Sequence, residues 1–441
     1  MIVAITICLV WFSIETVLLH YHARQFKLVD NSFHVGDKRG AKAPRLAMLP
    51  DKSVLMSWTE PQDSGHVLKF GVFKNGQWVR HGEVAHGENW FVNWADLASV
   101  VAIDEKFWVA HWLVKQQGGK TYDYDIAVAI SHDAGLTWSK PKPPHQDGAA
   151  SEHGFATIFP EGNDAGMIWL DGRDYVKQED RTKHPEKSGN FNLRYTRIYR
   201  DGSFGDEVVI DNNTCTCCWT SVAVTPLGVI AAWRSRTDAE IRDNKVALLR
   251  KGVWSAPKPL GAEGWKIAGC PVNGPAIVAR DSQVAAAWFT AQGDKPRVRA
   301  AFSNDGGQSF GKPIEIDNVS PLGRIGLVWR DDNTAVVSWM TTVDGATKKS
   351  SLALRPVHKN GTLGSITKVV EISAGRDAGV PQMAADDKRL MLAWTADAPD
   401  YGIKTVEIAW QDIPLTDSTK LQSFAVGKLL PFIPYICGRA H

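Results

Sequence analysis

The stretch Val54-Leu55-Met56-Ser57-Trp58 is the first of seven apolar runs that end in tryptophan. The others end at Trp112, Trp169, Trp233, Trp288, Trp339 and Trp394, at intervals of 54, 57, 64, 55, 51 and 55 residues. Each run follows an earlier apolar segment that a turn closes, as Leu46 to Leu49 precedes Pro50-Asp51. A repeat of about fifty residues built from short strands is typical of four-stranded propeller blades. We therefore predict an all-β chain that forms a β-propeller of seven blades.

Length, composition and charge narrow the class of protein further. The chain has 441 residues, of which 44% are hydrophobic, and this is ample for a buried core. A repeat array of this length can form one closed domain. The formal net charge of +2 gives no reason to expect nucleic acid or an acidic membrane surface as the main partner.

The N-terminal stretch is apolar from Met1 to Phe12 and again from Val17 to Leu19. It is long enough for a signal sequence or a single membrane anchor, although Glu15 interrupts it and no lysine or arginine precedes it. A buried element of the domain is the alternative. We predict a signal sequence or anchor over residues 1–22, the propeller over 23–425 and a C-terminal tail over 426–441. An extracytoplasmic location follows, in which the protein is periplasmic, secreted or tethered to a membrane.

Two eight-residue stretches share the pattern Ser-x-Asp-x-Gly-x-(Ser/Thr)-(Trp/Phe), one from Ser131 to Trp138 and one from Ser303 to Phe310. In such a turn the aspartate accepts hydrogen bonds within the turn, glycine supplies an unusual φ, and the aromatic ring packs back onto the blade. The two stretches resemble the Asp-box, or BNR repeat, of the sialidase superfamily, and the repeat pattern extends the resemblance over roughly residues 40 to 412. Asp-boxes in that superfamily are structural and lie on the face opposite the active site. Its catalytic propellers usually have six blades, so six is the alternative count if one unit here is a split or decayed blade.

The loops that lead into the innermost strands of a propeller converge on one mouth of the central channel. Here those loops contain Asp96, His153, the stretch Cys215 to Cys218, Cys270, Arg324 and Arg376. The loops after the tryptophan strands lie on the same face and bring Arg173, Tyr175, Arg234, Arg236, Glu240 and Tyr401. We therefore expect the functional site at this mouth.

The leading hypothesis is a sialidase-like glycoside hydrolase, of the exo-alpha-sialidase type, or a glycan-binding protein. The resemblance implies three arginines that grip a substrate carboxylate, a Tyr-Glu nucleophile pair and an aspartate acid/base. Arginine suits a carboxylate because its planar fork bonds both oxygens. The candidate clamp residues are Arg173, Arg234, Arg236, Arg324 and Arg376. Asp96 is the candidate acid/base, Tyr175 or Tyr401 the nucleophile, and Glu240 its partner.

This hypothesis implies a glycan or a small carboxylated ligand and needs no cofactor. The superfamily's Arg-Ile-Pro motif reads Lys42-Ala43-Pro44 in this chain, and spacing assigns no Tyr-Glu pair. Ordinary blade-to-blade salt bridges are the alternative role for each arginine.

The second hypothesis is a metal or thiol-redox site made by Cys215, Cys217, Cys218 and Cys270 with His153. Thiolates and an imidazole suit zinc or copper. The C-x-C-C tract also resembles tracts in uncharacterised Asp-box proteins, which brings no established activity. Disulfides in an exported protein are the simpler alternative. A third hypothesis is a non-catalytic platform whose mouth binds a protein or glycan partner.

Overall fold

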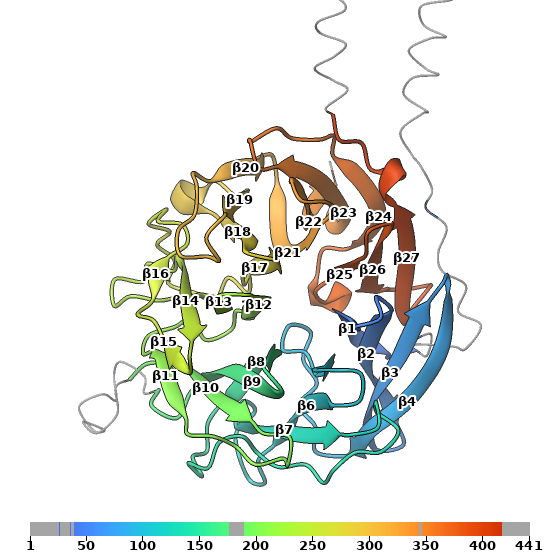
Figure 1. Ribbon diagram of the computed structural model, residues 1–441, viewed down its shortest axis with the longest axis vertical. Coiled ribbons are helices and arrows are strands. Elements are labelled where there is room, and N and C mark those ends of the chain that lie inside the picture. Colours follow the sequence, from blue (N-terminus) through green and yellow to red (C-terminus); the bar gives the residue numbers. More distant parts are fainter. Residues whose placement is uncertain (1–25, 27–35, 37–38, 176–188, 344–345, 417–441) are drawn as a thin grey trace, which may run out of the picture.

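The computed structural model describes residues 26, 36, 39–175, 189–343 and 346–416 of the chain. Seven antiparallel sheets stand around a central axis, and the chain passes through them in sequence order (Figure 1). This arrangement confirms the all-β, seven-bladed propeller predicted from the tryptophan repeat. The six-bladed alternative is wrong, because each of the seven repeats forms a sheet of its own.

Each blade begins at the channel and ends at the rim. The innermost strands are β1 (Lys42–Met48), β5 (Ser99–Ala102), β8 (His153–Glu161), β12 (Ser221–Thr225), β17 (Ala276–Arg280), β21 (Pro321–Trp329) and β25 (Gln382–Ala385). The second strands are β2 (Val54–Gln62), β6 (Trp108–Lys115), β9 (Asp164–Asp171), β13 (Gly228–Arg234), β18 (Gln283–Thr290), β22 (Thr334–Val343) and β26 (Arg389–Thr395).

The outer half of each blade is more variable. The third strands are β3 (Gly65–Lys74), β7 (Tyr124–Ser131), β10 (Asn192–Ile198), β14 (Asn244–Arg250), β19 (Arg297–Ser303), β23 (Ala346–His358) and β27 (Ile403–Ala409). The outermost strands are β4 (Gln77–Gly87), β11 (Val208–Asp211), β15 (Val253–Trp254) with β16 (Lys258–Pro259), β20 (Ile314–Asp317) and β24 (Thr367–Ser373). Within the described residues, the 3₁₀ helices η3 (Gln292–Asp294) and η4 (Arg376–Ala378) lie between strands, and η5 (Trp410–Asp412) follows β27.

All seven repeat tryptophans lie on second strands, and all are buried. A second strand is covered by the neighbouring blade on each face, so a large apolar ring fits there, but its indole N–H then needs an acceptor. Trp233 donates to Asp211 Oδ2 (2.9 Å) and Trp339 donates to Asp317 Oδ2 (2.7 Å). Each acceptor ends the outermost strand of the preceding blade. Trp233 and Trp339 therefore join neighbouring blades through hydrogen bonds, whereas Trp58 and Trp169 donate to acceptors on their own strands, Glu60 and Asp171.

The ring closes between the first and the last blade. Met56 and Trp58 of β2 share one buried cluster with Met391 and Ala393 of β26, and β1 runs beside the last blade (Figure 1). The last blade has three strands within the described residues. Phe26 packs against the cluster that contains Trp394.

The two Ser-x-Asp-x-Gly turns have the expected internal hydrogen bonds. Asp133 Oδ1 accepts from Ser131 Oγ (2.7 Å) and from the Thr137 backbone N–H (2.9 Å). Asp305 makes the same contacts with Ser303 (2.7 Å) and with the backbone N–H of Ser309 (3.0 Å). Both turns follow third strands, so they lie on the face opposite the loops that lead into the innermost strands.

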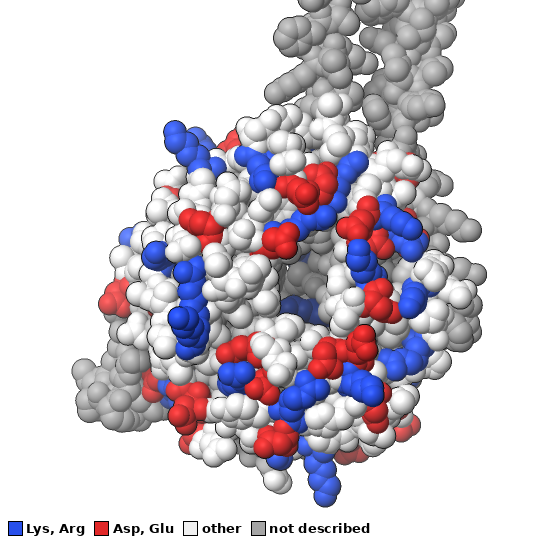
Figure 2. Space-filling model, viewed as in Figure 1, with Lys and Arg blue, Asp and Glu red and all other residues white. Residues whose placement is uncertain are grey.

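The predicted signal sequence or anchor over residues 1–22 and the tail over 426–441 lie outside the described residues. Within the part of the chain that the structure describes, no helix is both long and apolar enough to cross a membrane. Figure 2 shows acidic and basic side chains interspersed around a central hollow, so neither sign of charge dominates that face.

Candidate functional site

The loops that lead into β5, β8, β12 and β17 enclose a cleft of about 290 Å³, which we call the mouth cleft. Five aromatic side chains, several polar groups and a pair of cysteines surround it. Its lining residues include Phe91, Asn93, Trp94, Tyr122, Tyr124, Glu152, Phe155, Cys217, Cys270 and Arg376. A largely apolar and aromatic wall with a few convergent polar groups is typical of a small-molecule or glycan site.

Three ionisable side chains form a hydrogen-bonded chain at this cleft. Tyr124 is the first residue of β7, and its Oη lies 2.9 Å from both Asp96 Oδ2 and Glu152 Oε1. A phenol has one hydrogen to donate, so a carboxyl group that also bonds its oxygen must itself carry a proton. Asp96 and Tyr124 are buried, whereas Glu152 is half-buried beside the cleft.

The surroundings of both carboxyl groups favour the protonated form. Burial raises the pKa of Asp96 to about 7, against the opposing hydrogen bonds from Tyr124 and the Phe155 N–H and the charge of Arg45. Burial also raises the pKa of Glu152 to about 8, where the charge of Asp96 adds to the effect while the Tyr124 bond and His153 oppose it. Burial and the two carboxyl groups raise the pKa of Tyr124 well above its ordinary value, so it stays a phenol.

Asp96 also holds two blades together. Its Oδ1 accepts a hydrogen bond of 2.7 Å from the N–H of Phe155, which has a left-handed φ of 51° at a bulge in β8. Asn273 makes the equivalent bond, also of 2.7 Å, to the N–H of Arg324, whose φ is 56°. We call a side chain that accepts such a bond from a neighbouring blade a latch. Asp96 and Asn273 are both latches, one a carboxyl group and the other an amide. Of these two, only Asp96 is also hydrogen-bonded to a tyrosine, Tyr124.

A glycine makes room for each of these latches. A Cβ atom on Gly154 would lie 2.1 Å from Asp96 Oδ2, and one on Gly323 would lie 2.1 Å from Asn273 Oδ1. Any larger residue at either position would push the latch side chain away.

The five candidate clamp arginines do not converge on one pocket. Buried Arg234 donates to the carbonyls of Asn273 (2.8 Å), Arg242 (2.6 Å) and Phe289 (2.8 Å). Arg324 is likewise bound to carbonyls, those of Gly375 (2.6 Å) and Gly379 (2.8 Å), and burial lowers its pKa to about 10. Both guanidinium groups bind backbone carbonyls and are not directed at a ligand. The arrangement of three arginines expected to bind a substrate carboxylate is therefore not present.

The remaining arginines differ in their partners. Arg173 is ion-paired with Asp171 and Glu207, and Arg236 is paired with Glu240. Arg376 is exposed, lines the mouth cleft and lies 6.0 Å from the centre of the Trp94 ring. Among the described residues, no carboxylate is within ion-pair distance of Arg376, so its charge is available to a ligand.

The other candidate catalytic residues are also dispersed. Tyr175 is 40% exposed and packs on Phe191, while Tyr401 lies under the guanidinium of Arg39. Glu240 is bound by Arg236 and Arg242, which lower its pKa against the effect of burial. None of these three side chains contacts Asp96 or lines the mouth cleft.

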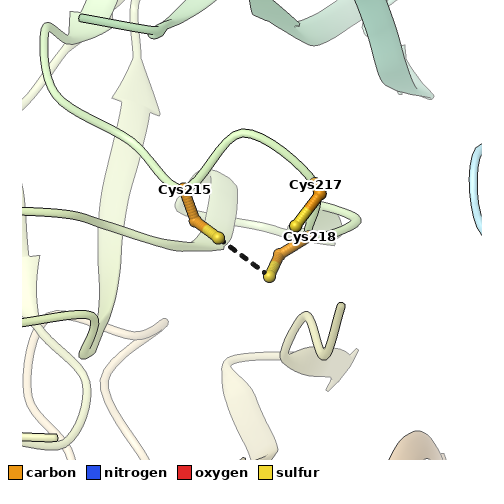
Figure 3. A group of neighbouring side chains, drawn as sticks. All are labelled: Cys215, Cys217 and Cys218. Carbon is orange, nitrogen blue, oxygen red and sulfur yellow. Dashed lines mark hydrogen bonds between the residues drawn. The ribbon is translucent and has the colours of Figure 1, made fainter. Parts of the chain in front are cut away.

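The four candidate cysteines do come together, but as two different pairs, and Figure 3 shows three of them, Cys215, Cys217 and Cys218. Cys217 and Cys270 form a disulfide, and both line the mouth cleft. Cys215 and Cys218 are buried thiols whose sulfurs lie 3.1 Å apart. Because Cys217 and Cys270 are joined in a disulfide, only the sulfurs of Cys215 and Cys218 are free to bind a metal. The arrangement in the structure therefore differs from a metal centre with four cysteine ligands.

His153 belongs to a separate cluster with His145, Asp125 and Asp147. The two imidazole rings are stacked, with centres 3.8 Å apart and planes within 10°. His153 Nε2 lies 3.3 Å from Asp147 Oδ2, and His153 Nδ1 faces Asp125 Oδ1 at 3.2 Å, outside the angles of a hydrogen bond.

A metal ion fits this histidine cluster poorly. Donor atoms of Asp125, His145 and His153 lie within 4.8 Å of one another. The lone pair of an imidazole nitrogen lies in the ring plane, so one ion cannot lie in the planes of two parallel rings. The contacts suit a protonated His153 held between carboxylates instead. Accordingly, the carboxylates of Asp125, Asp147 and Asp171 outweigh burial and raise the pKa of His153 to about 9.

Sequence reasoning missed Tyr124 and Glu152. Glu152 precedes β8 in one of the loops expected at the mouth, and Tyr124 begins a third strand on the same face. The topological rule that selected Asp96 therefore also selects these two residues. The rule could not predict that Tyr124 and Glu152 form a parallel bridge, because this contact depends on how two neighbouring blades pack.

No protein-family model matches this sequence, and no curated protein matches it. Among solved structures, an ulvan lyase of polysaccharide lyase family PL25, bound to -[GlcA(1-4)Rha3S]-, is similar with a TM-score of 0.52 and 11% identity over 91% of this chain and 99% of that one. The NanB sialidase from Streptococcus pneumoniae is similar with a TM-score of 0.44 and 12% identity, over 89% and 71% of the two chains. The α-L-arabinofuranosidase Arb93A from Fusarium graminearum has a TM-score of 0.45 and 12% identity, over 85% and 94%. At these identities, the likeness to the ulvan lyase shows a shared propeller fold.

Proposed function

We propose that the protein binds an acidic glycan in the mouth cleft and cleaves a glycosidic bond there, with Glu152 as the proton donor. The observation that carries this proposal is the hydrogen-bonded chain from Glu152 through Tyr124 to Asp96, which runs from the cleft into the interior. This role moves the acid function from Asp96, the candidate chosen from sequence, to a residue that a sugar can reach.

The protonation of Glu152 suits a general acid. With a pKa of about 8, its carboxyl group holds a proton at neutral pH and can give it to the leaving oxygen of a glycoside. The Tyr124 hydroxyl, 2.9 Å away, then stabilises the carboxylate that remains. Asp96 orients Tyr124 from behind and is a positioning residue in this scheme, because it is buried.

The rest of the cleft supplies binding contacts. Phe91 stacks on Tyr124 with ring centres 4.1 Å apart, and Tyr122 is 57% exposed beside it, which leaves an aromatic surface for the apolar face of a sugar ring. Arg376 offers a guanidinium at the edge of the same cleft. A carboxylate or sulfate on the sugar is the natural partner of that group. The fold is one on which the PL25 ulvan lyase holds a glucuronate-containing oligosaccharide, a parallel at the level of fold.

We also propose that the protein acts outside the cytoplasm. The Cys217–Cys270 disulfide and the apolar N-terminal stretch support this location, since disulfides persist mainly in oxidising compartments.

A product assay tests the proposed reaction. Purified protein is incubated with 3′-sialyllactose, a fluorogenic sialoside, glucuronate-containing oligosaccharides and neutral oligosaccharides, and products are identified by mass spectrometry. We expect cleavage of at least one acidic substrate, which Glu152→Gln abolishes and the exposed control Glu371→Gln does not. Binding of an acidic glycan without cleavage would favour the non-catalytic platform, and neither binding nor cleavage would contradict the proposal.

A further inference from the structure

The loop that leads into β12 brings a disulfide and a free dithiol together at the edge of the mouth cleft. Cys270, in the Cys217–Cys270 disulfide, is exposed, whereas the thiols of Cys215 and Cys218 are 0% and 1% exposed. The sulfurs of Cys215, Cys217 and Cys218 all lie within 4.8 Å of one another. Figure 3 shows these three side chains directed toward a common point.

We propose that the four cysteines form a thiol–disulfide relay, in which the buried Cys215/Cys218 dithiol reduces the Cys217–Cys270 disulfide and the exposed pair then reduces a low-molecular-weight disulfide from solvent. This activity does not depend on the glycan function, because it uses none of Glu152, Tyr124 or Arg376.

The surroundings of Cys215 are those of a nucleophilic cysteine. Arg242 Nη1 lies 3.3 Å from Cys215 Sγ, and the Arg242 side chain is itself fixed by Glu240 (2.9 Å) and by the carbonyl of Ile267 (3.1 Å). Arg234, which donates hydrogen bonds to three carbonyls, adds a second buried positive charge near Cys215. A thiolate with fixed guanidinium groups beside it is the reactive form of cysteine.

The two buried thiols are not equivalent. Burial opposes ionisation of Cys215, but the Cys218 thiol, Arg242 and the N–H of Cys217 outweigh it and lower the pKa of Cys215 to about 6. Burial and the neighbouring Cys215 raise the pKa of Cys218. The pair therefore holds one thiolate and one thiol at neutral pH.

The exchange balances within the chain. The Cys215 thiolate attacks Cys217 Sγ, so that a Cys215–Cys217 bond forms while the Cys217–Cys270 bond breaks and Cys270 leaves as a thiolate. Cys218 passes its proton to that thiolate through solvent and then attacks Cys215 Sγ, which forms the Cys215–Cys218 disulfide and releases Cys217. The inner pair is oxidised and the outer pair reduced, and no outside oxidant is needed.

The outer pair then completes the activity with a disulfide substrate. The Cys270 thiol loses its proton to solvent, and the resulting thiolate attacks one sulfur of the substrate, so that one substrate thiolate leaves and takes up a proton. The Cys217 thiolate then attacks Cys270 Sγ, re-forming the Cys217–Cys270 bond and releasing the second substrate thiol. Two electrons have passed from the inner pair to the substrate, and both protein pairs end as disulfides.

Trapping with iodoacetamide tests the internal step on the wild-type, full-length protein. Native protein is incubated with iodoacetamide without reductant, then denatured, digested with trypsin and mapped by mass spectrometry. Cys270 falls in the tryptic peptide 267–280, and Cys215, Cys217 and Cys218 fall in 201–234, so an intact Cys217–Cys270 bond links the two peptides. Cys8 and Cys437 lie in other peptides and are counted separately.

We expect peptide 267–280 to be released and alkylated at Cys270 while peptide 201–234 gains an internal Cys215–Cys218 disulfide. In Cys215→Ser the alkylation of Cys270 should slow by about tenfold or more, because the attacking thiolate is gone. Arg242→Gln should shift the pH midpoint of Cys270 alkylation upward, and Arg242→Lys should largely restore it. A structural role alone would not move this midpoint.

Two results would overturn the relay. One is wild-type protein in which the two peptides stay linked and Cys215 and Cys218 are alkylated only after denaturation. The other is equal alkylation of Cys270 in wild type and in a folded Cys215→Ser variant. The substrate step is tested with glutathione disulfide as the probe: we expect one equivalent to be reduced by wild type and none by Cys215→Ser, and no reduction by wild type would reject that step.

Discussion

Tyr124 Oη and Glu152 Oε1 lie 2.9 Å apart, although the two residues belong to different blades. The contact exists because the start of β7 forms a parallel bridge with the loop that leads into β8. It places a carboxyl group at the cleft in an environment that keeps it protonated at neutral pH. The proposed chemistry therefore depends on the packing of the second blade against the third.

Replacement of Glu152 by glutamine should abolish turnover and leave glycan binding nearly intact. The amide keeps the hydrogen bond to Tyr124 but cannot donate a carboxyl proton, and loss of a general acid costs roughly 10²- to 10⁴-fold in rate. Because the pKa of Glu152 is about 8, wild-type activity should fall as the pH rises through 8. A rate that is constant from pH 6 to 10 would rule out Glu152 as the acid.

Replacement of a buried candidate clamp arginine, such as Arg234, should lower the stability of the fold. Arg234→Ala leaves three backbone carbonyls without their donor, and we expect a loss of about 3 kcal/mol or more in the free energy of unfolding. The control Arg280→Ala removes a half-exposed ion pair with Asp332, which should cost about 1 kcal/mol or less. Chemical denaturation measures both values, and equal losses in the two variants would show that the buried bonds of Arg234 contribute little.

The positive charge of His153 should make the free energy of unfolding decrease as the pH rises into the alkaline range. Its pKa is raised from 6.5 to about 9 in the folded protein, so its stabilising contribution is full below pH 6.5 and is lost as the pH rises through 9. The difference in unfolding free energy between wild type and His153→Gln should shrink over that range. The variant His86→Gln, at an exposed position, is measured in parallel as a control for the effect of any histidine-to-glutamine change. A difference that does not change between pH 6 and 10 would mean that His153 is neutral throughout.

The fold could be predicted from the tryptophan spacing, because the second strand of every blade is covered on both faces and needs a large apolar side chain at the same position. The Ser-x-Asp-x-Gly turns were equally predictable, since all their hydrogen bonds are local. The arginines were not, because a charged residue in a mouth loop can bind a ligand or a nearby carbonyl. Arg234 binds a carbonyl of β18 and Arg324 binds one in the connection before β25, so the positions of these acceptors depend on how neighbouring blades pack.

The site was predictable in its location and only partly in its residues. Asp96 was expected at the mouth and lies beside it, but its burial and its latch to Phe155 exclude direct contact with a sugar. The sequence places Cys270 in a separate blade from Cys217, and their disulfide was one of several pairings that the spacing allowed.

Chelation should leave glycan turnover unchanged. The Cys217–Cys270 disulfide and the parallel imidazoles of His145 and His153 leave both sulfur and nitrogen donors poorly arranged for an ion. Turnover is measured before and after dialysis against EDTA, with zinc and copper determined by elemental analysis. Loss of turnover with EDTA that zinc or copper restores would revive the metal-centre hypothesis.

The most direct test of the central claim is the binding of acidic and neutral oligosaccharides to wild type, Arg376→Ala and the distal control Arg280→Ala, measured by titration calorimetry. The glycans are 3′-sialyllactose, a glucuronate-containing oligosaccharide and their neutral counterparts. We expect wild type and Arg280→Ala to bind an acidic glycan alike, with Arg376→Ala weaker by roughly 1.5–3 kcal/mol, as for the loss of a charge-assisted contact. Equal affinity of all three proteins for the acidic glycan, or no preference of wild type for acidic over neutral glycans, would contradict a glycan site at the mouth cleft.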